Sequence, residues 1–344
     1  NVTLPENPTL ELNLGTIENY PVTFNLSIQQ KGWNREQNLL NRTITTPQRW
    51  DRNLIDLSRF AGQTANIQLS LSAEKSGTLG IWGNPVIRNR QSGSAKKETP
   101  QKVILIWTDT LRKDHLKTYG YSRDTSPNMD KLASQGVKFA DTIAQATWTK
   151  VATPAMMTSL YPTTNGVRNF YDRLPSSATT MAEVFYNAGF ATVNYCGNLF
   201  TGKFTNLHQG FEEVNEDISL SDPNSSKTSR ETIDKFLPWL ESHKSVPFFA
   251  FVHLYDPHHP YKPKPPYDTM WADPARDKQQ QQETKKLVDA ITNPLMKMFE
   301  AASKDEFQKA GVDPKPYMQY NIDHYDGSIR GMDTEIGRLI EKLK

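Results

Sequence analysis

Residues 102–116 read Lys-Val-Ile-Leu-Ile-Trp-Thr-Asp-Thr-Leu-Arg-Lys-Asp-His-Leu. The apolar run over residues 102–107 is typical of a strand buried on both faces of a parallel sheet. Asp109 follows at the carboxyl end of this strand, where open α/β sheets bind their ligands. A carboxylate at that place suits a hard or borderline divalent cation. The simpler alternative is that Asp109 only caps the turn after the strand.

The chain downstream of this strand alternates between helical and extended patterns. This alternation predicts an α/β domain with a mostly parallel sheet. Helices are expected at residues 127–135, 153–160, 178–188, 229–240 and 325–343, and strands at residues 190–195 and 248–253. Residues 268–318 are polar and mostly helix-like, which predicts a solvated insertion, either a lid over a site or an exposed helical pair with no role.

The chain upstream has a different pattern. Residues 21–28 and 66–72 alternate apolar and polar side chains with period two, and turn residues separate such runs at short intervals. This pattern predicts a small all-β sandwich, jelly-roll-like, over residues 1–90. Residues 91–101 are polar and turn-rich and are expected to be a linker. The α/β domain then occupies residues 102–344.

Composition excludes several classes of function. The 344 residues are enough for two domains. The formal net charge of +2 gives no support for nucleic-acid binding. No apolar run of about 18 residues occurs, so no transmembrane segment is expected. Cys196 is the single cysteine, which excludes an intrachain disulfide and disfavours a cysteine-based zinc site.

The sequence motifs around Asp109 resemble the N-terminal part of the sulfatase-like family of the alkaline phosphatase superfamily. Asp-Thr-Leu-Arg-x-Asp-x-Leu at 109–116 is followed by Tyr-Gly-Tyr at 119–121, Thr-Ser-Pro-Asn-Met-Asp-Lys-Leu-Ala at 125–133 and Gly-Val-Lys-Phe at 136–139. The resemblance implies an alkaline-phosphatase/sulfatase-like sandwich around the parallel sheet. It also implies that Asp109 is a metal ligand, while Thr110 stands where many members carry a second Asp.

A second stretch that resembles the family, Trp148 to Pro162, carries the expected nucleophile. Sulfatases place Cys-x-Pro-x-Arg here, and the alignment puts Thr149 at the nucleophile position, with Val151 for the proline and Thr153 for the arginine. Threonine cannot yield the formylglycine aldehyde of true sulfatases. Metal coordination can deprotonate its hydroxyl, and phosphodiesterases, phosphonate hydrolases and lipid phosphotransferases of the superfamily use threonine beside divalent metals. The alternative is that Thr149 only caps the following helix.

A third stretch resembles the family's His-x-x-Asp-Pro-His-x-Pro-Tyr, at residues 253–261. The resemblance implies that His258 contacts the transferred group or protonates the leaving oxygen, and that His253 supports the site or contacts substrate. Lys150 and Asn198 are further candidate substrate contacts. The family's Gly-Lys-x-His is absent after residue 195, where Gly-Asn-Leu-Phe stands at 197–200, and Lys203 is out of register as a replacement.

These signals predict a metal-dependent hydrolase or transferase that acts on phosphate esters through Thr149. The resemblance implies a divalent ion (Ca, Mg, Mn or Zn) on Asp109 and Thr149, with a small-molecule, lipid-headgroup or glycan ester as substrate. After residues 333–339 the family supplies a strand ending in Asp-His or Asp-Asn that completes the metal site, so a remaining C-terminal part is expected. Family members mostly work outside the cytoplasm. The alternatives are a sulfuric-ester hydrolase without formylglycine and a non-catalytic glycan- or envelope-binding protein with a remnant sulfatase fold.

Overall fold

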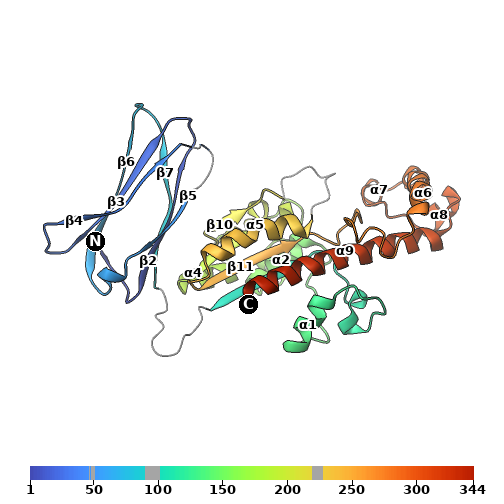
Figure 1. Cartoon of the computed structure of the whole chain (residues 1–344). Coiled ribbons are helices and arrows are strands. Elements are labelled where there is room, and N and C mark those ends of the chain that lie inside the picture. Colours follow the sequence, from blue (N-terminus) through green and yellow to red (C-terminus); the bar gives the residue numbers. More distant parts are fainter. Residues whose placement is uncertain (46, 48–50, 90–100, 219–227) are drawn as a thin grey trace.

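The computed structural model describes residues 1–45, 47, 51–89, 101–218 and 228–344. Within these residues the chain forms two antiparallel sheets followed by one parallel sheet that is flanked by helices (Figure 1). The mixed α/β architecture expected from the sequence is therefore confirmed. The expected linker at 91–101 lies outside the described residues, apart from residue 101.

The N-terminal part is a sandwich of two antiparallel sheets. One sheet has the order β1-β6-β3-β4 and the other the order β5-β2-β7. The strands are β1 (Val2–Thr3), β2 (Pro8–Thr16), β3 (Val22–Gln30), β4 (Glu36–Ile44), β5 (Asp51–Asp56), β6 (Thr64–Ala73) and β7 (Gly80–Asn89). Alternate residues of β2 and β3, among them Leu12 and Phe24, fill the core between the sheets, as the period-two pattern predicts.

The parallel sheet contains β8 (Lys102–Thr108), β9 (Ala191–Tyr195), β10 (Glu213–Asn215) and β11 (Phe248–Leu254) in the order β10-β9-β11-β8. Every residue of β11 is buried, because the strand lies between two others and is covered on both faces. The sequence also predicted that β8 is buried on both faces of the sheet, and this prediction is wrong. All seven residues of β8 are half-buried, because β8 is an edge strand of the described sheet.

Helices cover both faces of the parallel sheet. Side chains of α5 (Ser229–Ser242) and α9 (Pro314–Leu343) pack on one face, and those of α2 (Thr149–Thr158) and α4 (Met181–Asn187) pack on the other. The remaining α-helices are α1 (Pro127–Gln135), α3 (Pro162–Asn165), α6 (Asp277–Ala290), α7 (Pro294–Met298) and α8 (Lys304–Ala310). Figure 1 shows α9 running along the sheet and then out to α6, α7 and α8.

Two helices begin earlier than the sequence pattern indicated. α2 begins at Thr149 instead of residue 153, so Pro154 lies inside the helix. α9 begins at Pro314 instead of residue 325, with the Asp313 carboxylate accepting a hydrogen bond from the Lys315 amide at 3.0 Å. Polar side chains hid both starts, although Lys150 and Thr153 of α2 and Tyr317 of α9 are buried.

The predicted insertion at 268–318 contains α6, α7 and α8. It has a small core of its own, built from Leu287, Phe307, Val312 and Tyr317. This core shows that the segment is packed, in contrast to a merely exposed helical pair. Whether it moves as a lid stays a prediction.

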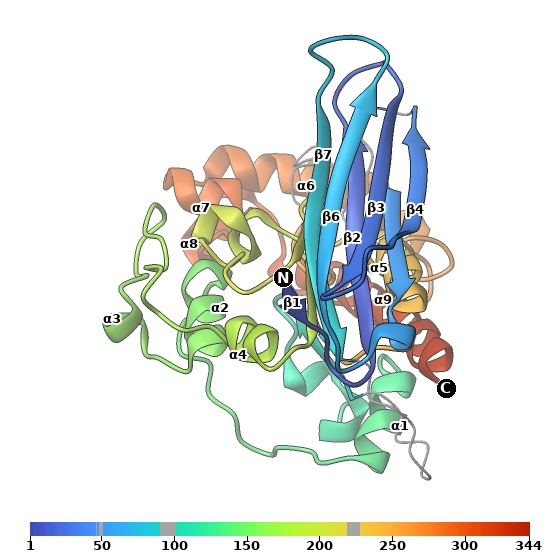
Figure 2. The ribbon, with the colours of Figure 1, turned by 90° about the vertical axis from the view of Figure 1, so that its left-hand side faces the viewer.

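The sandwich and the α/β part are in direct contact. Arg52 and Arg88 of the sandwich form ion pairs with Glu213 and Glu212 of the α/β part. Figure 2 looks from the side of the sandwich, whose long strands lie in front of part of the α/β domain. We propose the domain division expected from the sequence, with the sandwich at 1–90, a linker at 91–101 and the α/β domain at 102–344. No helix among the described residues has the length and apolar character needed to cross a membrane.

Candidate active site

Asp109 lies directly after β8, and its amide donates to the Leu254 carbonyl of β11 at 3.0 Å. This bond continues the ladder between the two strands by one residue and fixes the carboxylate at the carboxyl edge of the sheet. Asp109 is only 6% exposed. Because parallel strands all end at this edge, side chains that follow β9 and β11 are brought to the same place.

Thr149 is the first residue of α2, and its hydroxyl faces Asp109. The Thr149 Oγ1 lies 3.2 Å from Asp109 Oδ2 and 3.3 Å from Oδ1, as a donor to both. No side-chain cap closes this end of α2, so the hydroxyl is not consumed as a helix cap, which was the alternative interpretation. The positive end of the helix dipole therefore lies at the hydroxyl, where it favours anionic oxygens.

Asn198 and His253 complete the surroundings of the carboxylate. Asn198 Nδ2 donates to Asp109 Oδ2 at 2.9 Å, while its Oδ1 accepts from the Phe200 amide at 2.9 Å. His253 is fully buried, with Nε2 3.4 Å from Asp109 Oδ2. The loop over His253 requires glycine at 197, because a Cβ there would lie 2.6 Å from the His253 carbonyl oxygen.

The electrostatics of Asp109 favour its ionised form. Burial alone would raise the pKa of Asp109, but the nearby His253, together with His258 and the hydrogen bond from Thr149, holds the pKa below its usual range. A buried carboxylate that stays ionised is the group expected to bind a cation.

His258 lies on the loop after β11. Its Nδ1 is 2.6 Å from the His259 carbonyl oxygen, which makes Nδ1 the donor, and its ring stacks on Tyr255 with centroids 4.5 Å apart. These two contacts leave Nε2 as the nitrogen available to a ligand. The structure thus brings Asp109, Thr149, Asn198 and His253 together, with His258 beside them.

Lys150 is placed differently. Its side chain is fully buried, and Nζ donates to Thr205 Oγ1 at 3.0 Å and lies 4.4 Å from the centroid of the Phe204 ring. Burial lowers the pKa of Lys150 to about 8. A contact between Lys150 and substrate stays a prediction. Lys203, the out-of-register basic residue, pairs with Glu216 at 3.6 Å.

The sequence did not predict the contacts that hold Thr110, the residue after Asp109. Thr110 has φ 54°, a left-handed conformation that is strained for a β-branched residue. Its carbonyl accepts from the Tyr325 hydroxyl of α9 at 2.8 Å, and that hydroxyl accepts from the Arg112 amide at 2.9 Å. Strain held by neighbouring contacts is typical of functional sites, so positive φ here is the signal that sequence alone does not show.

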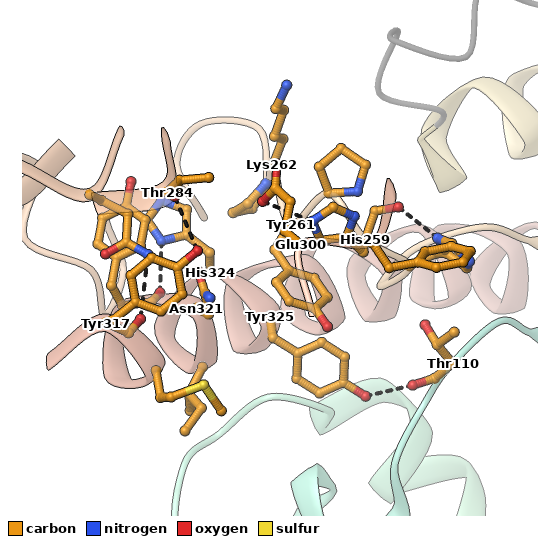
Figure 3. A pocket seen from close by; sticks show the side chains of 18 of the residues that line it. Thr110, His259, Tyr261, Lys262, Thr284, Glu300, Tyr317, Asn321, His324 and Tyr325 are labelled. Atoms are coloured by element: carbon orange, nitrogen blue, oxygen red, sulfur yellow. Dashed lines mark hydrogen bonds and ion pairs between the residues drawn. The ribbon is translucent and has the colours of Figure 1, made fainter. Parts of the chain in front are cut away.

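A large cavity of about 1230 Å³ opens beside these residues. Thr110, Tyr255 and His258 line its end near Asp109. The loop after β8, the segments 259–268 and 298–301, and helices α6 and α9 line the rest. Figure 3 shows Tyr325 linked to Thr110, with Tyr261 close to the Tyr325 ring. Its mixture of aromatic rings with a few polar groups is typical of a ligand site.

A second acidic cluster lies at the contact between the sandwich and the α/β part. Glu11, Glu213 and His243 have potential ligand atoms within 4.8 Å of one another. The Arg52 guanidinium occupies this space, with Nη2 2.7 Å from Glu11 Oε1, 2.6 Å from His243 Nε2, and in contact with Glu213. A cation is therefore already in place, so we interpret the cluster as an ion-pair network and not as a metal site.

Asp256, in the loop beside His258, should make the stability of the protein pH-dependent. Burial raises its pKa to about 6, although its Oδ2 accepts from the Ser229 amide at 2.7 Å. The folded state therefore holds a proton that the unfolded state releases near pH 4, and this contribution to stability is lost as the pH rises from about 4 to 6. Relative to wild type, we expect Asp256→Asn to gain about 2 kcal/mol of unfolding free energy between pH 4 and pH 7.5.

Urea unfolding of both proteins at the two pH values measures this difference, and taking the difference cancels the other titrating groups. Asp234→Asn, at a half-exposed ion pair with Arg338, serves as a control that should show a much smaller change. Parallel pH curves for wild type and Asp256→Asn would contradict the prediction.

The family model for sulfatases matches residues 101–344 of the chain. Among curated relatives, human arylsulfatase G is 32% identical over 125 residues, which cover 35% of this chain and 23% of the relative. Human arylsulfatase A is 31% identical over 122 residues, 33% of this chain and 24% of the relative. The chain thus matches only about a quarter of the length of these relatives.

Among solved structures, the phosphonate monoester hydrolase of Agrobacterium radiobacter superposes with a TM-score of 0.53 at 18% identity. The superposition covers 71% of this chain and 59% of that one. At this identity the likeness shows the fold alone, and it confirms the sulfatase-like architecture expected from the sequence.

Proposed function

The chain belongs to the sulfatase family, and from this premise we propose that it is a metal-dependent hydrolase or transferase of phosphate esters with Thr149 as nucleophile. The observation that carries the proposal is the contact between the Thr149 hydroxyl and the buried Asp109 carboxylate, at 3.2 and 3.3 Å. A hydroxyl at a helix start, held against an ionised carboxylate, is an arrangement suited to attack on an electrophilic phosphorus.

The residues around Asp109 fit a divalent cation. The site offers an ionised carboxylate and a hydroxyl, and both ring nitrogens of the buried His253 lack a hydrogen-bond partner among the described residues. Asp109 and Thr149 would hold the ion, and His253 is the nearest imidazole. When bound, such an ion lowers the pKa of a coordinated hydroxyl and neutralises charge on the phosphoryl oxygens.

The chain's own residues supply the remaining steps. The Thr149 hydroxyl loses its proton to water, its oxygen forms a bond to phosphorus, and the bond from phosphorus to the leaving oxygen breaks. His258 enters protonated and gives the Nε2 proton to that oxygen, so the alcohol departs neutral. Asn198, whose second amide hydrogen is free to donate, stabilises a phosphoryl oxygen. Water or a second alcohol then takes the phosphoryl group from Thr149.

Sulfuric-ester hydrolysis is the second candidate, because the family model and the arylsulfatase relatives favour it. Position 149 holds no residue that can form formylglycine. Cys196 does not replace it, since this thiol is buried, contacts Asn194 and Thr201, and has its pKa raised by burial. These observations support a phosphate ester as substrate over a sulfate ester.

Paired assays test the proposal. We expect the full-length protein, loaded in turn with Mg²⁺, Mn²⁺, Ca²⁺ and Zn²⁺, to hydrolyse 4-nitrophenyl phosphate or its phosphodiester at least about 100-fold faster than 4-nitrophenyl sulfate. A chelator should remove the activity, and the preferred ion should restore it. Faster sulfate hydrolysis would favour the sulfatase alternative. Absence of turnover with every ion would favour a non-catalytic binding protein.

The proposed function also includes the nature of the physiological ester. The cavity lined by Thr110 and His258 is the place that we propose for the alcohol portion of a small molecule, a lipid headgroup or a glycan. Action outside the cytoplasm stays a prediction that rests on the family resemblance.

A further inference from the structure

A buried Asp–His pair stands on the wall of the large cavity, away from the Thr149 contact. His115 Nδ1 lies 2.6 Å from Asp326 Oδ1, and Asp326 is fully buried on α9. The other carboxylate oxygen, Oδ2, accepts from the Tyr121 hydroxyl at 2.6 Å and from Arg123 Nη1 at 2.8 Å. Both oxygens of the Asp326 carboxylate therefore accept hydrogen bonds, and these bonds fix the position of the carboxylate.

This carboxylate determines which nitrogen of His115 remains free. Since Nδ1–H of His115 donates to Asp326, Nε2 is the nitrogen left to contact a ligand. No described residue bonds to Nε2, and the atom is not enclosed by protein. The ring is held between Tyr121 and Tyr325, with centroids at 4.7 and 4.9 Å, so its orientation is set in advance of any ligand.

The position of His115 connects it to the reacting end of the cavity. Both His115 and Thr110 line the cavity. Tyr325 bridges them, because its ring touches His115 while its hydroxyl donates to the Thr110 carbonyl at 2.8 Å. A group bound beside His115 therefore shares the cavity with Thr110 and His258, and it does not touch the Asp109–Thr149 contact, so it belongs to the alcohol portion of the proposed ester.

We propose that His115 contacts the alcohol portion of the ester through Nε2 by accepting a hydrogen bond from one of its hydroxyl groups, with Asp326 as the positioning residue. The substrates are then phosphate esters of hydroxylated alcohols, such as sugars or polyols. This inference rests on the proposed function. The rings of Tyr261 and Tyr325, packed at 5.4 Å, line the same cavity as His115, and a hydroxylated carbon skeleton uses both aromatic and hydrogen-bonding contacts.

The test compares glucose 6-phosphate with phenyl phosphate, an ester of similar size without alcohol hydroxyls. For His115→Gln, we expect the KM for glucose 6-phosphate to rise about 10-fold, the effect of losing one hydrogen bond. The kcat should stay within about twofold, and both constants for phenyl phosphate should not change. Asp326→Asn should act in the same direction on glucose 6-phosphate.

Ser328→Ala is the matched control, because it trims a buried hydroxyl of α9 that bonds to the His324 carbonyl at 3.0 Å and does not line the cavity. It should leave both substrates unaffected. Equal KM increases for the two esters, or no increase for glucose 6-phosphate, would overturn the inference.

Equilibrium binding separates this inference from the proposed reaction. The Thr149→Ala protein, which lacks the proposed nucleophile, is titrated with each ester by calorimetry with and without the His115→Gln change. Weaker binding of glucose 6-phosphate alone supports the role of His115 even if Thr149 proves not to be the nucleophile. Absence of glucose 6-phosphate binding before the His115 change, or equal weakening of both esters, overturns it.

Discussion

Thr149→Ala is expected to reduce kcat for phosphate-ester hydrolysis by at least about 1000-fold, because it removes the oxygen that bonds to phosphorus. Thr149→Ser keeps a hydroxyl at the start of α2 and should retain activity within about 10-fold of wild type. Steady-state kinetics measures both variants. Rapid quenching followed by mass spectrometry should find phosphate on residue 149 in wild type and in the serine variant only.

Thr158→Ala is a control on the same helix. Its hydroxyl bonds to the Pro154 carbonyl at 2.7 Å, at the opposite end of α2 from Asp109, so its loss should perturb the helix without touching the reaction. Full activity in Thr149→Ala would reject the nucleophile. Equal losses in Thr149→Ala and Thr158→Ala would show that the effect is structural.

The part of the site that the sequence predicted consists of residues that end strands or begin helices. Asp109, Asn198 and His253 follow or end parallel strands, and such strands all deliver their next residues to one edge of the sheet. Short sequence motifs at the ends of successive strands are therefore enough to predict that these side chains lie together. Thr149 was found by a different signal, the alignment of residues 148–162 with the nucleophile stretch of the family, although the helix was expected to begin at residue 153.

Sequence adjacency was a poorer guide inside a helix. Lys150 follows Thr149, but successive residues of a helix are rotated by about 100°. Thr149 thus faces Asp109, whereas Lys150 enters the packing between α2 and the Thr205 segment.

Contacts between side chains from distant parts of the chain could not be predicted from the sequence. His115 and Asp326 are 211 residues apart, and nothing near either residue indicates the other. Asp326 reads as one more polar residue on an amphipathic helix until α9 is packed against the loop after β8. Its burial with three donors is a tertiary property.

The contact between the sandwich and the α/β part was hidden for a related reason. On β2, Leu10 and Leu12 face the sandwich core, so Glu11 between them faces the other way. An alternating strand normally presents that face to water. Here Glu11 is only 5% exposed, because the end of α5 and its His243 cover it.

Glu11 joins the two parts through charge. Its Oε1 accepts from Arg52 Nη2 and from His243 Nε2, both at 2.7 Å, and its Oε2 accepts from Arg88 at 3.1 Å. Burial alone would raise the pKa of Glu11, but His243, Arg52 and Arg88 together hold it far below its usual range. The stability that this carboxylate contributes is therefore complete above its unfolded pKa near 4 and is lost as the pH falls below it.

Glu11→Gln is expected to lower the unfolding free energy at pH 7 by about 3–5 kcal/mol, the effect of leaving buried guanidinium groups without their carboxylate. Because the lost contacts join the sandwich to the α/β part, the single heat-capacity peak expected of wild type should separate into two, with the sandwich unfolding first. Differential scanning calorimetry and urea unfolding measure both effects. Glu6→Gln, at an exposed position of the same sandwich, should change stability by less than about 0.5 kcal/mol. If Glu11→Gln were equally harmless, the buried charges would have to be compensated without Glu11, and the ion-pair network would not be what holds the two parts together.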